Sequence, residues 1–394
     1  MKGMEGSLGL APAAGDRSSL RLALAGGGTG GHLVPGLHLL RWALGQGWAP
    51  SEVLWFTSGR PVETRVLGSI HEHLPGVDVR LVPLPLEGAQ GGAPSTLGLL
   101  SRSPQAMLLA RRALREFGSD VLLGLGGFTA LPCVLAAKSL GVPVALYEVN
   151  AVPGRATRRL APLARRVLHA WDGSVPKAGG SKHRVIRPVV GPEFVRADDP
   201  EQRARARRAL GWDPERPLLT VLGGSQGAGA LNRFVAQHAA RWTAAGWQVL
   251  HQTGPGRLPE AAPGQAGYHA TEYLDPMAPV LAASELVLGR GGASTLAELA
   301  AVGVPAWIVP YPHHNDRHQW HNAELLGAGV RLVDEEGLTL DRAEELAAWA
   351  GPQGEARLAA MRAAFEASPG GGAPALWNAL VELAPRLAAG ALVG

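Results

Sequence analysis

Short apolar runs alternate with longer stretches in which apolar residues recur at helical spacing, from about Ser19 to Phe365. Short apolar runs of this kind are typical of buried parallel strands, and the periodic stretches between them are typical of crossover helices. The pattern therefore predicts an α/β fold with doubly wound parallel sheets. It breaks once, at Arg187–Phe194, which contains two prolines and one glycine, and then restarts.

The break separates two sets of predicted elements. In the first set we predict strands at Ser19–Ala25, Glu52–Phe56, Asp78–Val82, Asp120–Leu125, Val142–Glu148 and Arg165–Ala170, and helices at Gly36–Leu44, Thr96–Phe117, Ala130–Leu140 and Gly154–Leu163. In the second set we predict strands at Leu218–Leu222, Gln248–Gln252, Glu285–Gly289, Ala306–Val309 and Val330–Val333, and helices at Pro200–Leu210, Ala228–Ala245, Ser294–Val302, Gln319–Leu326 and Leu340–Phe365.

The resulting domain plan has four parts. We expect residues 1–19 to form a flexible extension, 20–190 and 191–370 to form two Rossmann-like domains, and 371–394 to form a C-terminal helix and tail that can pack back on the first domain. The length of 394 residues, 46% of them apolar, is enough for two hydrophobic cores.

Composition narrows the class of protein. The single cysteine, Cys133, excludes an intramolecular disulfide and a cysteine metal cluster, which fits a reducing cytoplasm. The first 19 residues lack the apolar core of a secretory signal, and no uncharged apolar run reaches the roughly 18 residues of a membrane span. We therefore expect neither export by such a signal nor a spanning helix.

The net charge of +4 comes mostly from arginine and favours anionic partners such as phosphates or acidic lipid headgroups. The chain has no stripe of aromatic and basic residues and no zinc-finger signature, so we expect no nucleic acid as a partner.

Each half opens with a strand, a glycine-rich turn and a helix, with the turns at Gly26–Gly31 and Gly223–Gly227. Two more glycine turns, Gly124–Gly127 and Gly289–Gly292, also follow predicted strands. Such a turn lets the backbone approach a phosphate, and the N-terminus of the next helix favours its negative charge. Any one turn could be a tight turn without a ligand, but open α/β sheets place their ligands at this edge. We expect the four turns to meet across a cleft between the domains.

At this level of detail the chain resembles the MurG family of glycosyltransferases. The similar segments keep the family's order: Gly26-Gly27-Gly28-Thr29-Gly30-Gly31-His32 with Pro35-Gly36, Glu148 with Asn150, Gly223–Ala228 with Leu231-Asn232, His251–Gly254, Tyr273–Met277, Arg290–Glu298, and Asp316-Arg317 with Gln319 and Asn322.

The resemblance implies a GT-B fold, with an acceptor-binding N-terminal domain and a C-terminal domain for UDP-N-acetylglucosamine. It implies inverting transfer of N-acetylglucosamine to the 4-hydroxyl of a polyprenyl-diphosphate-linked N-acetylmuramyl-pentapeptide (lipid I to lipid II), in peptidoglycan synthesis. The protein would then be peripheral, at the cytoplasmic face of the cell membrane. No Asp-x-Asp motif occurs in the chain, so we expect metal-independent chemistry with no cofactor and no metal site.

His32 is the candidate catalytic base, because a histidine pKa of ~6.5 suits proton acceptance near neutral pH. Alternatively, it caps the next helix or orients the acceptor. The resemblance also implies a set of substrate-binding residues: Thr29, Gly30, Gly31, Asn150, Ser225, Leu274, Ala293, Ser294, Thr295, Leu296, Ala297, Glu298, His318 and Gln319. Within this set Glu298 would accept hydrogen bonds from the ribose hydroxyls; otherwise it is an ordinary exposed carboxylate.

Some positions depart from the family pattern. Tyr147 stands in place of a histidine, Val190 in place of an arginine, His318 in place of a glutamine, and Phe128–Leu131 differs from the family's Tyr-Val-Ser-Gly. His314 and His318 have a spacing that would suit a metal on a helix, but no cysteine or clear carboxylate partner accompanies them.

A further pattern suggests contact with an anionic membrane surface. Apolar residues and arginines occur close together between residues 97 and 115: Leu97, Leu99, Leu100, Met107, Leu108 and Leu109 beside Arg102, Arg111, Arg112 and Arg115. An apolar patch ringed by arginines can rest on an anionic leaflet, although an ordinary amphipathic helix buried on its sheet has the same pattern.

Three other functions stay open on sequence alone. They are another UDP-sugar enzyme of the same fold, such as a natural-product glycosyltransferase or a UDP-N-acetylglucosamine 2-epimerase, a dinucleotide-dependent oxidoreductase, and an inactive UDP-sugar-binding module. The oxidoreductase is disfavoured because Gly26–Gly31 lacks the Gly-x-Gly-x-x-Gly spacing and no acidic residue ends the second strand.

Overall fold

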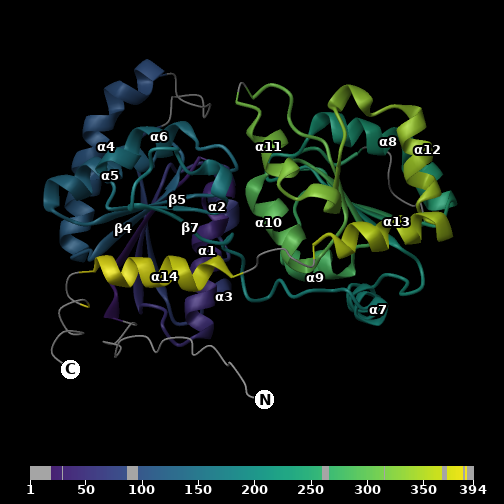
Figure 1. The fold of residues 1–394 in the computed structure, drawn as a ribbon, viewed down its shortest axis with the longest axis horizontal. Helices are drawn as coiled ribbons and strands as arrows, with labels where there is room; N and C mark the ends of the chain where they lie inside the picture. The colour runs from purple at the N-terminus through teal and green to yellow at the C-terminus, as the bar shows by residue number, and fades with distance from the viewer. Residues whose placement is uncertain are drawn as a thin grey trace, which may run out of the picture.

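The computed structural model describes residues 19–28, 30–86, 96–259, 266–314, 316–365, 371–384 and 387. Within these residues the chain forms two parallel sheets that lie side by side, each with helices on both faces (Figure 1). This architecture confirms the predicted α/β class with two doubly wound domains. No helix in the described part of the chain combines the length and the apolar character that a membrane crossing requires.

The first sheet has the strand order β3-β2-β1-β4-β5-β6-β7, and all its pairs are parallel. Its strands are β1 (Leu22–Gly26), β2 (Glu52–Thr57), β3 (Asp78–Pro83), β4 (Val121–Gly126), β5 (Val144–Glu148), β6 (Arg166–His169) and β7 (His183–Val185). Its helices are α1 (Val34–Gly45), α2 (Pro61–Leu67), α3 (Ile70–His73), α4 (Thr96–Phe117), α5 (Ala130–Leu140) and α6 (Arg155–Leu160), with short 3-10 turns at Gly30–His32, Ala161–Leu163 and Asp172–Ser174.

The second sheet has the order β10-β9-β8-β11-β12-β13 and is also parallel. Its strands are β8 (Leu218–Leu222), β9 (Gln248–Gln252), β10 (Tyr268–Thr271), β11 (Leu286–Gly289), β12 (Ala306–Ile308) and β13 (Val330–Leu332). Its helices are α7 (Pro200–Ala209), α8 (Gly229–Ala244), α9 (Met277–Ala283), α10 (Ala293–Val302), α11 (His318–Glu324), α12 (Leu340–Ala348) and α13 (Pro352–Ala363), with 3-10 turns at Gly327–Gly329 and Glu335–Gly337.

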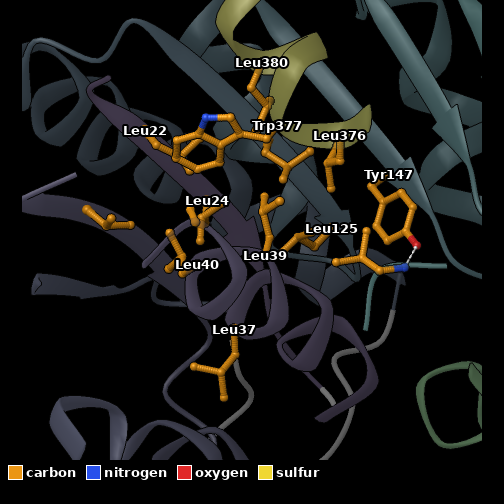
Figure 2. Packing of buried hydrophobic residues seen from close by; sticks show 14 of the residues in the cluster. Leu22, Leu24, Leu37, Leu39, Leu40, Leu125, Tyr147, Leu376, Trp377 and Leu380 are labelled. Atoms are coloured by element: carbon orange, nitrogen blue, oxygen red, sulfur yellow. Dashed lines mark hydrogen bonds between the residues drawn. The ribbon is translucent and has the colours of Figure 1, made fainter. Parts of the chain in front are cut away.

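Side chains of β1 alternate between two cores, as the period of a strand requires. Leu22 and Leu24 pack with α1 and with the last helix, α14 (Gly372–Leu383), whereas Ala23 and Ala25 pack with α4 and α5. In Figure 2 the indole of Trp377 lies beside Leu22, with Leu380 and Leu376 on the same helix. Helix α14 therefore returns from the second sheet to cover the first (Figure 1).

Tyr147, one of the departures from the family pattern, belongs to this core. Its side chain is buried, and its hydroxyl accepts a hydrogen bond from the backbone N–H of Val189 at 2.9 Å (Figure 2). Burial raises the pKa of Tyr147 well above its ordinary value, so the hydroxyl stays neutral. At this position the tyrosine ties β5 to the segment that leads into the second domain.

Some predicted elements were wrong in extent. The stretch Leu340–Phe365 contains two helices: the first ends at Ala348, and the second begins at Pro352 after its N-cap, Gly351. β7, β10, α2, α3 and α9 were not predicted; each is short, and the two strands lie at sheet edges, where apolar alternation is weak.

Candidate active site

The four glycine turns lie where the strand order of each sheet reverses. In the first sheet this point is between β1 and β4, and in the second it is between β8 and β11. Loops at the carboxyl ends of such adjacent strands form the ligand crevice of open α/β sheets. The fold therefore brings Gly26–Gly31 beside Gly126-Gly127, and Gly223–Gly227 beside Gly289–Gly292.

The first glycine turn is held by a buried carboxylate that the sequence did not single out. Glu63 of α2 accepts backbone N–H groups of Gly28 at 2.5 Å, Ser58 at 2.8 Å and Gly59 at 2.7 Å. It also accepts the N–H of Arg60 and the hydroxyl of Ser58. These bonds fix the turn after β1 to the turn after β2. The one sequence signal for Glu63 is its position as the third residue of a helix that begins with proline, where a glutamate can cap the start of the helix.

His32 follows the first glycine turn and packs against Gly126 and Gly127 in the turn after β4. Its Nδ1–H donates to the carbonyl oxygen of Gly27 at 3.1 Å. A Cβ on Gly126 would lie 3.0 Å from Cδ2 of His32, and one on Gly127 would lie 3.1 Å from Nδ1 and still closer to the carbonyl oxygen of Gly27. Both glycines have positive φ, of +100° and +76°. Glycine is needed at both positions to give the imidazole its space.

The environment of His32 lowers its pKa below the ordinary value of 6.5. Burial is the main cause, and the charge of His318 acts in the same direction. The carbonyl of Gly27 and the carboxylates of Glu148 and Glu63 oppose the shift without cancelling it. His32 is therefore neutral at pH 7, with its second ring nitrogen in the unprotonated state that a base requires.

Across the interface, the second domain presents serines to the first glycine turn. A Cβ on Gly30 would lie 3.5 Å from Oγ of Ser225, which follows β8. Ser294 of α10 donates to the carbonyl oxygen of Gly31 at 3.5 Å. Four of the predicted residues thus meet, two from each domain. Thr29, predicted beside them, lies outside the described residues.

Helix α10 presents its N-terminus at this place. It begins after Gly292. A Cβ placed on Gly292 would meet no atom within 4 Å, so there is open space beside this residue. Ala293, Ser294 and Thr295 form its first turn, whose N–H groups precede the first intrahelical bond, from Leu296 to the carbonyl of Gly292. The side chains of Leu296 and Ala297 are buried, so these two residues can reach a ligand only through the backbone.

Glu298 is buried and not solvated, with 7% of its surface exposed. Its Oε1 accepts a hydrogen bond of 3.0 Å from Nε2 of His38, which lies on α1 in the other domain. Leu274, in the loop between β10 and α9, is half-buried against the same core as α10. The next residue, Asp275, lies 3.3 Å from Nε2 of His73, so this loop also touches the first domain.

Asparagine side chains bridge the domains on the other side of the site. Asn322 of α11 accepts the N–H of Ala151 at 2.8 Å and donates to Oδ1 of Asn150 at 3.1 Å and to the carbonyl of Gly291 at 3.2 Å. Asn150 in turn donates to Glu148 at 3.0 Å. The carboxamide of Asn150, predicted to bind the donor sugar, is thus engaged by protein groups in this structure.

Gln319 and His318 begin α11. The carboxamide oxygen of Gln319 accepts the N–H groups of Tyr311 at 2.9 Å and Gly291 at 3.3 Å. His318 donates from Nδ1 to Asp316 at 2.8 Å, and its ring lies 4.4 Å from that of His314. Among the described residues no three histidine, cysteine or carboxylate side chains are grouped so that they could hold a metal ion.

Comparison with known sequences and structures agrees with this geometry. Residues 22–169 match the glycosyltransferase family 28 N-terminal domain, and residues 218–342 match the glycosyltransferase family 28 C-terminal domain.

Two curated relatives carry the same name, UDP-N-acetylglucosamine--N-acetylmuramyl-(pentapeptide) pyrophosphoryl-undecaprenol N-acetylglucosamine transferase. The protein of Acidothermus cellulolyticus is 38% identical over 80% of this chain and 85% of its own length. The protein of Sodalis glossinidius is 36% identical over 84% of this chain and 90% of its own length. The crystal structure of MurG from Acinetobacter baumannii superimposes with a TM-score of 0.63 at 22% identity, covering 92% of this chain and 99% of that one, and so shares the fold.

Proposed function

This chain belongs to the MurG family of GT-B glycosyltransferases, and from that premise we propose how its domain interface carries out the transfer of N-acetylglucosamine from UDP-N-acetylglucosamine. The chain is a UDP-sugar hexosyltransferase that forms lipid II from lipid I. The geometric observation that supports the proposal is the contact between the start of α10 and the first glycine turn, where Ser294 donates to the carbonyl oxygen of Gly31, next to His32.

The reaction is a single displacement with inversion. The 4-hydroxyl oxygen of the muramyl sugar forms a bond to C1 of N-acetylglucosamine, the bond from C1 to the β-phosphate oxygen breaks, and UDP leaves with the electron pair. The hydroxyl proton passes to His32, which is neutral at pH 7 because burial lowers its pKa. Its Nδ1–H bond to Gly27 places the accepting lone pair on Nε2.

The charge that develops on the UDP pyrophosphate needs stabilisation. We assign this role to the N-terminus of α10, whose first N–H groups at Ala293, Ser294 and Thr295 lack intrahelical acceptors, and to the hydroxyl of Ser225. Gly30, Gly31 and Thr29 would contact the diphosphate of the acceptor on the opposite side. Protein groups thus take the place that a divalent metal occupies in many other glycosyltransferases.

Recognition of the donor involves the second domain. Glu298 would accept the ribose hydroxyls, and the backbone of Leu274 would contact the uracil. The Nε2 donors of Gln319 would bind the hydroxyls of N-acetylglucosamine, because its oxygen is already held by two backbone N–H groups. His318 and Asn150 would also contact N-acetylglucosamine. Asn150 would then give up its hydrogen bond with Asn322 and bond to the sugar in its place.

The acceptor is a lipid, so the protein must meet a membrane surface. α4 supports this part of the proposal, because Leu108 on this helix is 68% exposed and Leu109 is 38% exposed. Arg112, which pairs with Glu116, is 79% exposed on the same helix. We propose that this face of the first domain rests on the anionic cytoplasmic leaflet, and that the protein is peripheral there.

The product identifies the acceptor. Purified protein, UDP-N-acetylglucosamine and a short-chain lipid-linked muramyl-pentapeptide should give a product heavier by one N-acetylhexosamine residue, detected by mass spectrometry. The same muramyl-pentapeptide without the lipid diphosphate is the matched control and should react much more slowly. Transfer to unrelated aglycones but not to the lipid-linked sugar would contradict the proposal.

A further inference from the structure

One histidine at the domain interface has no place in the reaction described above. His38 lies on α1 in the first domain and is only 4% exposed. Its Nε2 lies 3.0 Å from Oε1 of Glu298 on α10 in the second domain. The two residues are 260 positions apart in the chain, so the contact exists only when the domains are together. A carboxylate can only accept, hence Nε2 of His38 carries the proton in this bond.

Residues of the interdomain segment surround His38. The ring of Phe194 meets the imidazole edge-on, with the ring centroids 5.1 Å apart. Oε1 of Glu193 lies 4.0 Å from Nδ1 of His38, and Arg41 of α1 lies 2.7 Å from the same oxygen. His38 therefore packs against the segment that joins the domains and donates to the helix of the donor site, while its Nδ1 makes no hydrogen bond to the described residues.

A buried carboxylate is costly unless a donor satisfies it. Within the described part of the chain, His38 donates the hydrogen bond to the carboxylate of Glu298. This bond occupies Oε1, one of the two carboxylate oxygens. The other oxygen, Oε2, makes no hydrogen bond to any described residue, which leaves it to accept from a ligand hydroxyl. A site whose side chain is fixed before the ligand arrives binds more tightly, because less freedom is lost on binding.

We propose that His38 is a positioning residue for the donor: it holds Glu298 so that the carboxylate faces the ribose of UDP-N-acetylglucosamine. The inference rests on the proposed role of Glu298 in ribose recognition. In this proposal the acceptor-binding domain takes part in donor recognition, because ribose binding and the approach of the two domains both depend on the hydrogen bond between His38 and Glu298. Each should then favour the other.

The test compares two nucleotides on the full-length protein. UDP and 2′-deoxy-UDP differ only in one ribose hydroxyl, so the ratio of their dissociation constants, measured by calorimetry, reports on Glu298. A hydrogen bond to a charged group is worth about 1.5–3 kcal/mol, so the wild type should prefer UDP by roughly 10- to 100-fold. His38→Ala should bind UDP roughly tenfold more weakly and lose most of this preference, with 2′-deoxy-UDP little affected.

Three further variants separate positioning from a structural role. His38→Gln should restore the preference because its amide N–H can reach the place of Nε2, whereas His38→Asn is too short and should not. This pair also decides the matter if the alanine variant does not fold. His73→Ala is the matched control, since His73 also bonds across the interface, to Asp275 at 3.3 Å, and should leave the ratio unchanged.

The outcomes distinguish the inference from the proposal on which it rests. A wild-type protein that binds both nucleotides equally would remove Glu298 from the ribose site, and the donor assignment would fail with it. A wild type that prefers UDP, together with a His38→Ala variant that prefers it equally, would overturn the role of His38 alone. Tighter binding of UDP by His38→Ala would also overturn it, because His38 would then be a competitor of the ribose.

Discussion

Nδ1 of His32 lies 3.1 Å from the carbonyl oxygen of Gly27, five residues earlier in the chain. A carbonyl oxygen can only accept, so this bond places the ring proton on Nδ1 and the lone pair on Nε2. The same turn that shapes the glycine loop therefore selects the tautomer of the proposed base. Because burial also lowers the pKa of His32 below 6.5, the neutral, basic form of the ring predominates at pH 7.

The pH dependence of the reaction should reflect this. His32 accepts a proton only when neutral, and its pKa is below 6.5, so kcat/KM for the acceptor should fall on the acidic side with a midpoint below 6.5 and level off as the pH rises above that midpoint. His32→Gln should lower kcat by about 10²- to 10⁴-fold and abolish the acidic limb. The measurement is a kcat/KM profile with saturating donor. An unchanged acidic limb in the variant would assign it to another group.

Gly126 should be needed for the placement of this base. Gly126→Ala puts a methyl group 3.0 Å from Cδ2 of His32, and a shift of the ring by a few tenths of an ångström to 1 Å should lower kcat by about 10- to 100-fold. Gly141→Ala is the matched control, since Gly141 has a similar positive φ of +74° but open space around it. The control should keep its kcat and lose only about 1 kcal/mol of stability. Equal kcat in both variants would contradict the packing argument.

Membrane binding should depend on the exposed apolar residues of α4. Leu108→Glu with Leu109→Glu removes apolar surface and adds two negative charges, and should weaken binding to anionic vesicles at least about tenfold in a flotation assay. The control is Leu258→Glu with Leu340→Glu, which makes the same charge change at exposed positions in the second domain. If both double variants lose binding alike, net charge and not this helix controls the association.

The last helix should be necessary for the stability of the first domain. Trp377 is fully buried between α14 and β1 (Figure 2), so Trp377→Ala should lower the free energy of unfolding by about 3–5 kcal/mol, and Trp377→Phe by less. Urea unfolding followed by circular dichroism measures the change. An alanine variant as stable as the wild type would show that α14 contributes little to this core.

The sequence predicted the central elements better than the peripheral ones. The strands predicted at Leu218–Leu222 and Gln248–Gln252 have the same limits in the structure, because both are buried runs with clear ends. β10 is only partly buried at the edge of its sheet, so its residues carry no apolar signal that the prediction could use. The family membership, expected from motif order, and the two-domain α/β fold, expected from chain length and the restart of the strand and helix pattern, are confirmed by the comparisons.

Contacts within the site could not be predicted in the same way. The glycine turns predict a phosphate site from sequence, because the backbone N–H groups that bind phosphate belong to a short continuous segment. Glu63, His38 and Asn322 act on residues that are 35, 260 and 172 positions away, at Gly28, Glu298 and Asn150. No pattern in one sequence encodes such pairs, since each depends on how sheets and domains are placed. The roles of the site residues stay predictions.

The most direct test of the proposed mechanism is UDP release from UDP-N-acetylglucosamine in the presence of EDTA, with and without the lipid-linked muramyl-pentapeptide. Wild type should release UDP only with the acceptor, His32→Ala should lose about 10²- to 10⁴-fold in kcat, and Glu298→Ala should chiefly raise the KM for the donor. Release that needs a divalent metal, that proceeds without the acceptor, or that is unaffected by His32→Ala would contradict the account.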